Sequence, residues 1–232
     1  MTKVLSMPSL KSKMRGRLAA AHGQRTNTTN NLWLCYSVKL NQDLSLSSNN
    51  ELIYWLADLE SNRNVRSFKF GYNIHIQVND QKQNFKPIDA IQVILDTGYE
   101  EIHHITSKIG HVDAFSATFR LEDDSVRNIT YRAITEDYLA IRAKYAARLL
   151  RLLPFVAQMR YKKWLFEEEI ILNTLKILKS GDIQEVIANT PVSDEMIVIG
   201  IVAKYIFQGV IKQTNLSMSD FGRSTWWSLS ES

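Results

Sequence analysis

Residues 85–108 read FKPIDAIQVILDTGYEEIHHITSK, and this stretch decides the fold class. Two β-prone runs flank the Asp96-Thr97-Gly98 step, which is typical of a tight hairpin turn. The runs therefore predict two neighbouring antiparallel strands. The first strand carries Asp89 and the second ends at Lys108, so we expect the hairpin to bring these two side chains to the same end of a sheet.

Outward from this hairpin, the chain alternates between helix and strand patterns. Residues 51–60 have apolar side chains at helical spacing after a polar 47–50 segment that offers N-cap groups. Residues 65–78 alternate apolar and polar side chains, as a half-buried strand does. An α/β layer fold follows from this order of elements. Further along, the patterns predict a helix over 112–127, a strand over 128–134, and a helix over 138–153 that the Thr135-Glu136-Asp137 segment caps and Pro154 ends.

A second pattern begins near Phe166. It predicts three helices, over 167–179, 183–188 and 195–208, and a β-ribbon within 210–229. Asp182 is the predicted cap of the second helix, and Ser193-Asp194 that of the third. Three helices followed by a ribbon form the layout of a winged-helix domain. The sequence therefore predicts a flexible basic arm (1–31), a mixed α/β domain (32–160) and a winged-helix-like, all-α domain (161–232).

Composition places the chain among ordinary globular proteins. Hydrophobic residues make up 45% and charged residues 22%, and no apolar run approaches the roughly 18 to 20 residues of a membrane span. The first residues lack the apolar core of a secretory signal. The one cysteine, Cys35, excludes an internal disulfide and a cysteine-based zinc site. We therefore expect a buried thiol and a cytoplasmic location.

The net charge of +4 is unevenly distributed. Residues 1–42 contain seven basic residues, Lys39 among them, and no acidic one. Such an arm can neutralise DNA phosphates, or it can be a flexible tail that only improves solubility. The residues predicted to contact DNA are Lys11, Lys13, Arg15, Arg17 and Arg25 of the arm, with Lys162 and Lys163 near the start of the second pattern.

Glu51, Asp89 and Lys108 form a possible catalytic set. Two carboxylates can hold Mg²⁺, which prefers oxygen ligands and polarises a phosphate for attack by water, while a nearby ammonium offsets developing charge. Each residue also has a structural alternative: favouring the helix dipole for Glu51, charge pairing in a buried strand for Asp89, and plain surface exposure for Lys108. His103 and His104 are expected to be ordinary strand residues, one facing in and one facing out.

The stretch 85–98 followed by 101–108 resembles the Y-x-P-D-F-x-V-x-x-x-D-G … I-x-V-K pattern of TnsA-type transposon endonucleases, which belong to the PD-(D/E)xK superfamily. Residues 51–56 and 65–68 look like the acidic helix and following strand of that family. Residues 129–137 are similar to its late strand, which ends in a T-D or T-E step. The resemblance extends from about residue 45 to residue 230.

Two positions depart from the pattern. Ile88 separates Pro87 from Asp89, and Thr106 stands where the superfamily usually has Glu or Gln. The TnsA family tolerates a neutral residue at the second position because its helix glutamate supplies the second acid. Thr106 can still offer an oxygen to the metal shell.

The resemblance implies a restriction-endonuclease-like mixed sheet flanked by helices, and hydrolysis of DNA that depends on Mg²⁺ with Mn²⁺ as a substitute. In that scheme Asp89 is the main metal ligand, Glu51 is the second ligand, Thr106 belongs to the metal shell, and Lys108 positions the attacking water. The expected partners are double-stranded transposon ends, a TnsB-like DDE transposase and a TnsC-like AAA+ ATPase regulator. The chain would cut the non-transferred strand at the 5′ ends of the element.

Two alternatives remain open. The first is a non-catalytic DNA-binding or assembly subunit of a transposition complex. The second is a restriction- or repair-like nuclease that acts alone. The first would rely on the basic arm and on the following residues of the second half: Lys162, Lys163, Lys204, Lys212, Arg223, Trp226 and Trp227.

Overall fold

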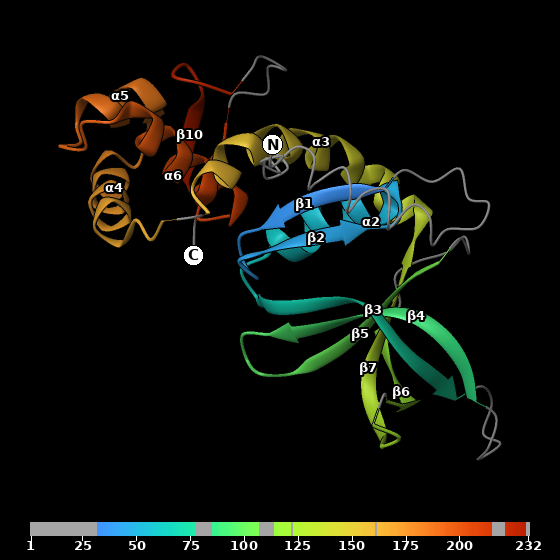
Figure 1. Ribbon diagram of the computed structural model, residues 1–232. Coiled ribbons are helices and arrows are strands. Elements are labelled where there is room, and N and C mark those ends of the chain that lie inside the picture. The colour runs from blue at the N-terminus through green and yellow to red at the C-terminus, as the bar shows by residue number, and fades with distance from the viewer. Residues whose placement is uncertain are drawn as a thin grey trace, which may run out of the picture.

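The computed structural model describes residues 32–77, 85–106, 114–121, 123–160, 162–214 and 221–230. It shows a mixed α/β protein with a strand barrel at one end and the helices α4, α5 and α6 at the other, joined by the long helix α3 (Figure 1). The elements are β1 (Trp33–Ser37), β2 (Gln42–Leu46), α2 (Asn49–Tyr54), η1 (Trp55–Glu60), β3 (Val65–Gln77), β4 (Phe85–Leu95), β5 (Glu100–Thr106), β6 (Ala114–Arg120), β7 (Val126–Thr135), α3 (Glu136–Gln158), α4 (Leu165–Leu178), β8 (Ser180–Asp182), α5 (Ile183–Ala188), α6 (Glu195–Phe207), β9 (Ile211–Gln213) and β10 (Trp226–Leu229).

Five strands close into a barrel in the order β3-β4-β5-β7-β6. Only the β5–β7 pair is parallel, so the sheet is mixed, as the family resemblance implied. The sheet is closed into a barrel, however, and is not the open layer flanked by helices that was expected. A small cluster that includes Ile74, Ile102 and Phe119 fills the barrel. Ile91 and Val93 on β4 belong instead to the larger core that α2, η1 and α3 share.

The helix predicted over residues 112–127 is wrong, because Ala114–Arg120 forms strand β6. This strand pairs with both β7 and β3 and so closes the barrel. Phe119 and Leu121, two residues apart, are buried in the barrel cluster, as a period of two requires. A short apolar run does not by itself distinguish a strand from a helix, and barrel closure decides here.

The helix predicted after the Ser47–Asn50 segment is confirmed. Ser48 is the N-cap, and its hydroxyl accepts a hydrogen bond from the backbone N–H of Glu51 at 3.1 Å. The second half of this helix, η1, is a π-helix, a form often found near functional sites. The predicted apolar face is buried throughout: Leu52, Trp55, Leu56 and Leu59.

Lys39, counted in sequence with the basic arm, has a structural role instead. Its ammonium donates hydrogen bonds to the carbonyls of Leu59 at 2.8 Å and Val65 at 2.7 Å, and also to the carbonyl of Asn62. These bonds satisfy carbonyl groups at the end of η1, in the loop that follows it and at the start of β3. Burial lowers the pKa of Lys39 to about 8. The basic character of residues 1–42 is therefore not all available to DNA.

Helix α3 begins at the predicted cap, Thr135, whose hydroxyl accepts from Tyr138 N–H at 3.3 Å. It then runs past Pro154, so the predicted end at this proline is wrong. The apolar series continues across Pro154, with Leu149 and Leu152 before it and Val156 after it all buried. That burial offsets the roughly 3 kcal/mol that a proline costs inside a helix.

The C-terminal segment contains α4, α5 and α6 and a three-stranded antiparallel sheet in the order β8-β10-β9. The predicted caps Asp182 and Asp194 are confirmed. Strand β8 forms where the sequence predicted only a helix stop, so the segment is not all-helical. The large core runs without interruption from α2 and α3 into α6. Among the helices described, none is long and apolar enough to cross a membrane.

Candidate functional site

Glu51 and Asp89 line one cavity of about 170 Å³. Glu51 comes from the first turn of α2 and Asp89 from β4, while His104 and Ile105 of β5 complete one wall. The cavity therefore brings together two of the three side chains that the sequence predicts to be catalytic.

A bulge in β3 forms the opposite wall. The β3–β4 register shifts between Lys69 and Tyr72, and Gly71 within the bulge has φ of +64°. Phe70 and Gly71 both line the cavity, and a Cβ on Gly71 would meet nothing within 4 Å. The bulge bends β3 at the point where β4 presents Asp89.

Both carboxylate oxygens of Glu51 accept hydrogen bonds from Ser47, one from its hydroxyl at 2.6 Å and the other from its backbone N–H. Together with the Ser48 cap, these bonds fix the start of α2. Glu51 therefore has the structural role given above as its alternative, because it stabilises the first turn of α2. The same bonds hold its carboxylate in a defined orientation at the cavity.

Asp89 is exposed, as are its neighbours Lys86 and Pro87. Its apolar neighbours in sequence predicted that Asp89 lies in a buried strand, and this part of the prediction is wrong. Only the second half of β4 is buried, because that half packs against the helices. The cost of burying an unpaired charge therefore gives no argument about the role of Asp89.

The remaining predicted site residues lie apart from this cavity or outside the described residues. Thr106 is the last residue of β5 and pairs with Thr135 of β7, but it does not line the cavity. Lys108 and the arm residues Lys11, Lys13, Arg15, Arg17 and Arg25 lie outside the described part of the chain.

The two carboxylates limit the kind of metal site that the cavity can support. Within the described residues, no group of three or more His, Cys, Asp or Glu side chains lies close enough to hold a metal ion. A closed protein cage is thus not formed by these residues. Mg²⁺ often binds through only one or two carboxylates, waters and substrate phosphate oxygens, and Glu51 with Asp89 fits that donor set.

A chain of polar groups lies beside the cavity. The hydroxyl of Tyr54 is 2.5 Å from Nδ1 of His103, whose Nε2 is 2.7 Å from a carboxylate oxygen of Glu101. Arg132 on β7 reaches the same carboxylate at 3.3 Å. Burial lowers the pKa of His103, and the bond from His103 with the charge of Arg132 keeps the pKa of Glu101 below its usual value despite burial.

The predicted placement of the two histidines is confirmed: His103 is buried, and His104 on the opposite face is partly exposed. The polar chain itself was missed. Its signal in the sequence is the spacing of Glu101 and His103, two residues apart on one face of a strand. The sequence carries no signal for Tyr54, because its contact with His103 depends on how α2 lies over β5.

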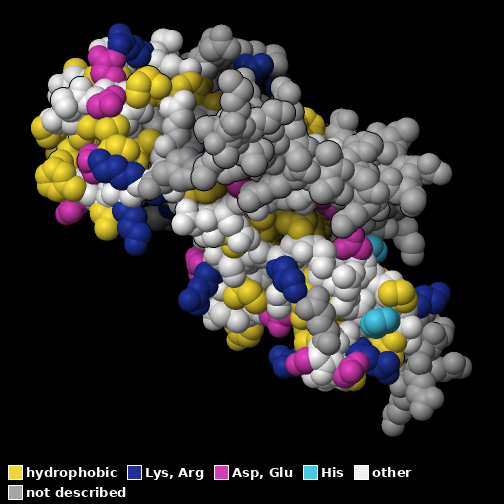
Figure 2. Space-filling view, viewed as in Figure 1, with side chains coloured by type: hydrophobic (Ala, Val, Ile, Leu, Met, Phe, Trp, Pro, Cys, Tyr) yellow, Lys and Arg dark blue, Asp and Glu magenta, His cyan; other side chains and the backbone are white. Residues whose placement is uncertain are grey.

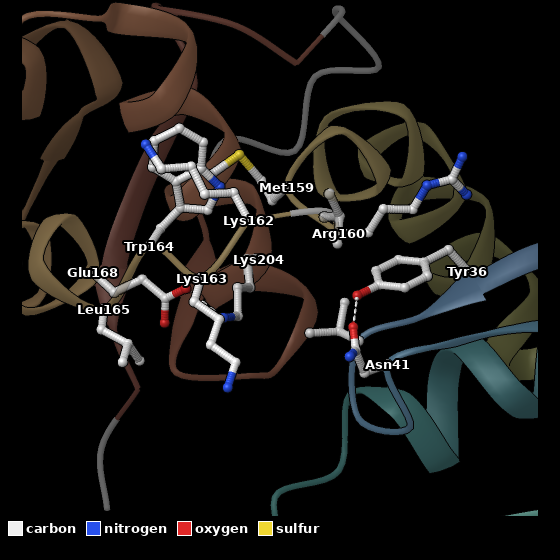
Figure 3. Close-up of a pocket in the computed structure, with 12 residues that line it drawn as sticks. Tyr36, Asn41, Met159, Arg160, Lys162, Lys163, Trp164, Leu165, Glu168 and Lys204 are labelled. Carbon is white, nitrogen blue, oxygen red and sulfur yellow. Dashed lines mark hydrogen bonds and ion pairs between the residues drawn. The ribbon is translucent and has the colours of Figure 1, made fainter.

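Lys162 and Lys163 are exposed at a separate cavity of about 500 Å³ (Figure 3). The ammonium of Lys162 lies 3.8 Å from the centre of the Trp164 ring, a cation–π contact. Lys204, from α6, is paired with Glu168 at 2.7 Å. Lys162 and Lys163 are thus accessible cations, and their predicted contact with DNA stays a prediction.

The residues of the C-terminal segment that the assembly-subunit alternative would use to contact DNA differ in their exposure and pairing. Trp227 is fully buried and belongs to the core, whereas Trp226 is 52% exposed. Arg223 forms an ion pair with Glu195. Lys212 is exposed on β9.

Comparisons with protein-family models, with curated protein sequences and with solved structures return no match for this chain.

Proposed function

We propose that this protein is a Mg²⁺-dependent DNA endonuclease of the TnsA type, which cuts the non-transferred strand at the 5′ ends of a transposon. One observation carries the proposal: Glu51 and Asp89, far apart in sequence, line one cavity beside β5. The chain continues from the end of β5 at Thr106 to Lys108, the third residue of the proposed catalytic set.

Each residue has a distinct role in the proposed reaction. Asp89, exposed at the cavity, is the main ligand of Mg²⁺, and Glu51 is the second ligand, oriented by its bonds from Ser47. The bound metal polarises the scissile phosphate and lowers the pKa of water. Lys108 holds the attacking water and offsets charge on the phosphate.

The C-terminal segment is proposed to be a winged helix that binds DNA and the partner proteins. Its element order, α4-β8-α5-α6-β9-β10, and its sheet order, β8-β10-β9, support this proposal because they match the orders expected of a winged helix. Hydrophobic side chains gather over the α4–α5 end of the molecule (Figure 2). Leu165, Phe166 and Ile177 of α4 are each more than 70% exposed, and such apolar groups favour a protein partner like the TnsC-type regulator.

The alternative of a non-catalytic assembly subunit is favoured by one observation. Both carboxylate oxygens of Glu51 already accept hydrogen bonds from Ser47, which is sufficient to explain this residue as part of a helix cap. In that function the chain would bind transposon ends through its basic residues, and Asp89 would be an ordinary surface carboxylate.

Metal binding separates the two functions. Mn²⁺ is titrated into the full-length protein bound to transposon-end duplex, and the bound ion is followed by electron paramagnetic resonance. The proposal expects the parent protein to bind Mn²⁺ and Asp89→Ala to lose it, while Asp124→Asn, an exposed aspartate in the β6–β7 turn, binds as the parent does. Equal binding by Asp89→Ala would favour the assembly subunit. Cleavage without the recombinase would favour a nuclease that acts alone.

A further inference from the structure

A cavity of about 570 Å³ lies where the loop after η1, helix α3 and the α6–β9 segment meet. Its floor is apolar, because Leu149, Leu152, Ile206 and Ile211 line it and are all at most 5% exposed. Tyr145, 42% exposed, lines the cavity nearer the surface. The size falls within the range of roughly 300 to 1,000 Å³ that is typical of small-molecule sites.

Three cationic side chains line this cavity: Arg63 from the loop, Arg148 from α3 and Lys212 from β9. No carboxylate is among the lining residues. Within the described part of the chain, none of the three forms an ion pair. The cavity therefore concentrates positive charge above an apolar floor.

The arrangement is held by tight packing between the loop and the α6–β9 segment. Gly209 has φ of +72°, and a Cβ at this position would lie 2.7 Å from the carbonyl oxygen of Ser61. The guanidinium of Arg63 donates to the carbonyl of Val210 at 3.1 Å, which orients it beside Lys212 on the same cavity. The bond to Val210 fixes the charge of Arg63 before any ligand arrives.

Neutral hydrogen-bonding groups complete the lining. Asn62 and Asn64 supply two amides. The hydroxyl of Ser230 also lines the cavity; it is shielded from solvent and has no hydrogen-bond partner within the described part of the chain. A buried polar group without a partner costs free energy unless a ligand or water satisfies it.

We propose that this cavity binds a nucleotide, with the phosphate against Arg63, Arg148 and Lys212 and the base over the apolar floor. Guanidinium groups match phosphate oxygens in geometry and charge, and an apolar floor with an adjacent tyrosine suits a planar base. A free nucleoside 5′-phosphate and the terminal nucleotide of a DNA strand carry the same chemistry. Binding of a DNA strand end rests on the proposed endonuclease function, whereas binding of a free nucleotide does not.

The test is calorimetric titration of the full-length protein in EDTA, which removes metal from the reaction. The probes are AMP, adenosine, and a short single-stranded oligonucleotide with either a 5′-phosphate or a 5′-hydroxyl. We expect AMP to bind at least tenfold more tightly than adenosine. Arg148→Gln and Lys212→Gln should each weaken AMP binding at least tenfold. Lys144→Gln, an exposed cation of α3 that does not line the cavity, should leave it unchanged.

Binding of AMP no tighter than that of adenosine overturns the proposal, as does parent-like AMP binding by both Arg148→Gln and Lys212→Gln. Tighter binding of the 5′-phosphorylated oligonucleotide than of AMP identifies a strand end as the ligand, and the reverse identifies a free nucleotide. Asp89→Asn should bind AMP as the parent does, so loss of nuclease activity and loss of nucleotide binding remain distinguishable.

Discussion

The hydroxyl of Tyr54 lies 2.5 Å from Nδ1 of His103 and joins helix α2 to strand β5. Nε2 of His103 lies 2.7 Å from the Glu101 carboxylate, which can only accept, so Nε2 carries the proton and Nδ1 accepts from Tyr54. This bond connects the helix that carries Glu51 to the strand that lines the candidate site. Two sides of the cavity are therefore held to each other by one buried hydrogen bond.

Tyr54→Phe removes this bond and leaves Nδ1 of His103 buried without a partner. We expect the free energy of unfolding to fall by about 1–3 kcal/mol, the usual cost of an unsatisfied buried polar group. Urea unfolding followed by circular dichroism measures the change. Tyr99→Phe, at a position that is 74% exposed, is the matched control and should alter stability little. Equal stabilities for Tyr54→Phe and the parent would show that the bond contributes nothing.

The buried histidine predicts a dependence of stability on pH. Burial lowers the pKa of His103 below its usual 6.5, although the neighbouring Glu101 acts in the opposite direction and Arg132 adds to the lowering. As pH falls below 6.5, the unfolded chain binds a proton at His103 before the folded protein does, so the contribution to stability is lost on acidification.

The measurement is the urea midpoint between pH 7 and about pH 5, compared between the parent protein and His103→Gln. Asp58 and Glu60 have pKa values raised by burial and titrate in both proteins, so the difference between the two curves reports His103 together with the Glu101 carboxylate bonded to it. The parent should lose more stability than His103→Gln over this interval. His75→Gln, at an exposed position of β3, should follow the parent. Parallel curves for the parent and His103→Gln would contradict this account.

Much of the local structure could be predicted because short sequence signals determine it. The hairpin around Asp96-Thr97-Gly98 and the caps Ser48, Thr135 and Asp182 depend on neighbouring residues alone, and all four were predicted. The predicted helix end at Pro154 was wrong for the same reason. The free-energy cost of a proline in a helix can be read from the local sequence, but the burial that offsets it comes from the distant core.

The site was less predictable because it depends on tertiary placement. That Glu51 and Asp89 share a cavity follows from how α2 lies over the sheet. The residue types and the family pattern suggested this pairing, but no local signal determines it. Strand β6 forms because β3 and β7 are both available to pair with it. The role of Lys39 depends on carbonyl groups contributed by residues 59–65, which no local pattern places beside it.

Gly209 ends α6 with a pair of hydrogen bonds, from its own N–H to Ile206 and from Val210 N–H to Tyr205. Gly209→Ala would require a left-handed alanine whose Cβ lies 2.7 Å from the carbonyl of Ser61. The conformation alone costs about 1–2 kcal/mol, and the clash adds to this. Gly98→Ala requires the same left-handed conformation but causes no clash, because no atom lies within 4 Å of a Cβ at this position. Thermal unfolding should show a larger loss for Gly209→Ala than for Gly98→Ala, and equal losses would contradict the packing described.

Pro154 interrupts the hydrogen bonding of α3 at an exposed position. Pro154→Ala restores a backbone donor within the helix and should raise the free energy of unfolding by roughly 1–3 kcal/mol. The urea midpoint is again the measurement. Ala157→Pro, three residues on in the same helix, is the reciprocal change and should destabilise the protein. A lower midpoint for Pro154→Ala would mean that the proline supports a bend required by the packing.

The proposed endonuclease is tested most directly by strand-resolved DNA cleavage. A duplex with a 5′-labelled non-transferred strand at the transposon end is incubated with the partner recombinase, Mg²⁺ and either the parent protein, Asp89→Asn or Asp124→Asn. The proposal predicts a labelled product that requires Mg²⁺, appears equally with the parent and Asp124→Asn, and falls at least a hundredfold with Asp89→Asn, about 2.7 kcal/mol or more of transition-state stabilisation. Cleavage by Asp89→Asn at the rate of the parent would contradict the assignment of Asp89 as the metal ligand at the centre of the site.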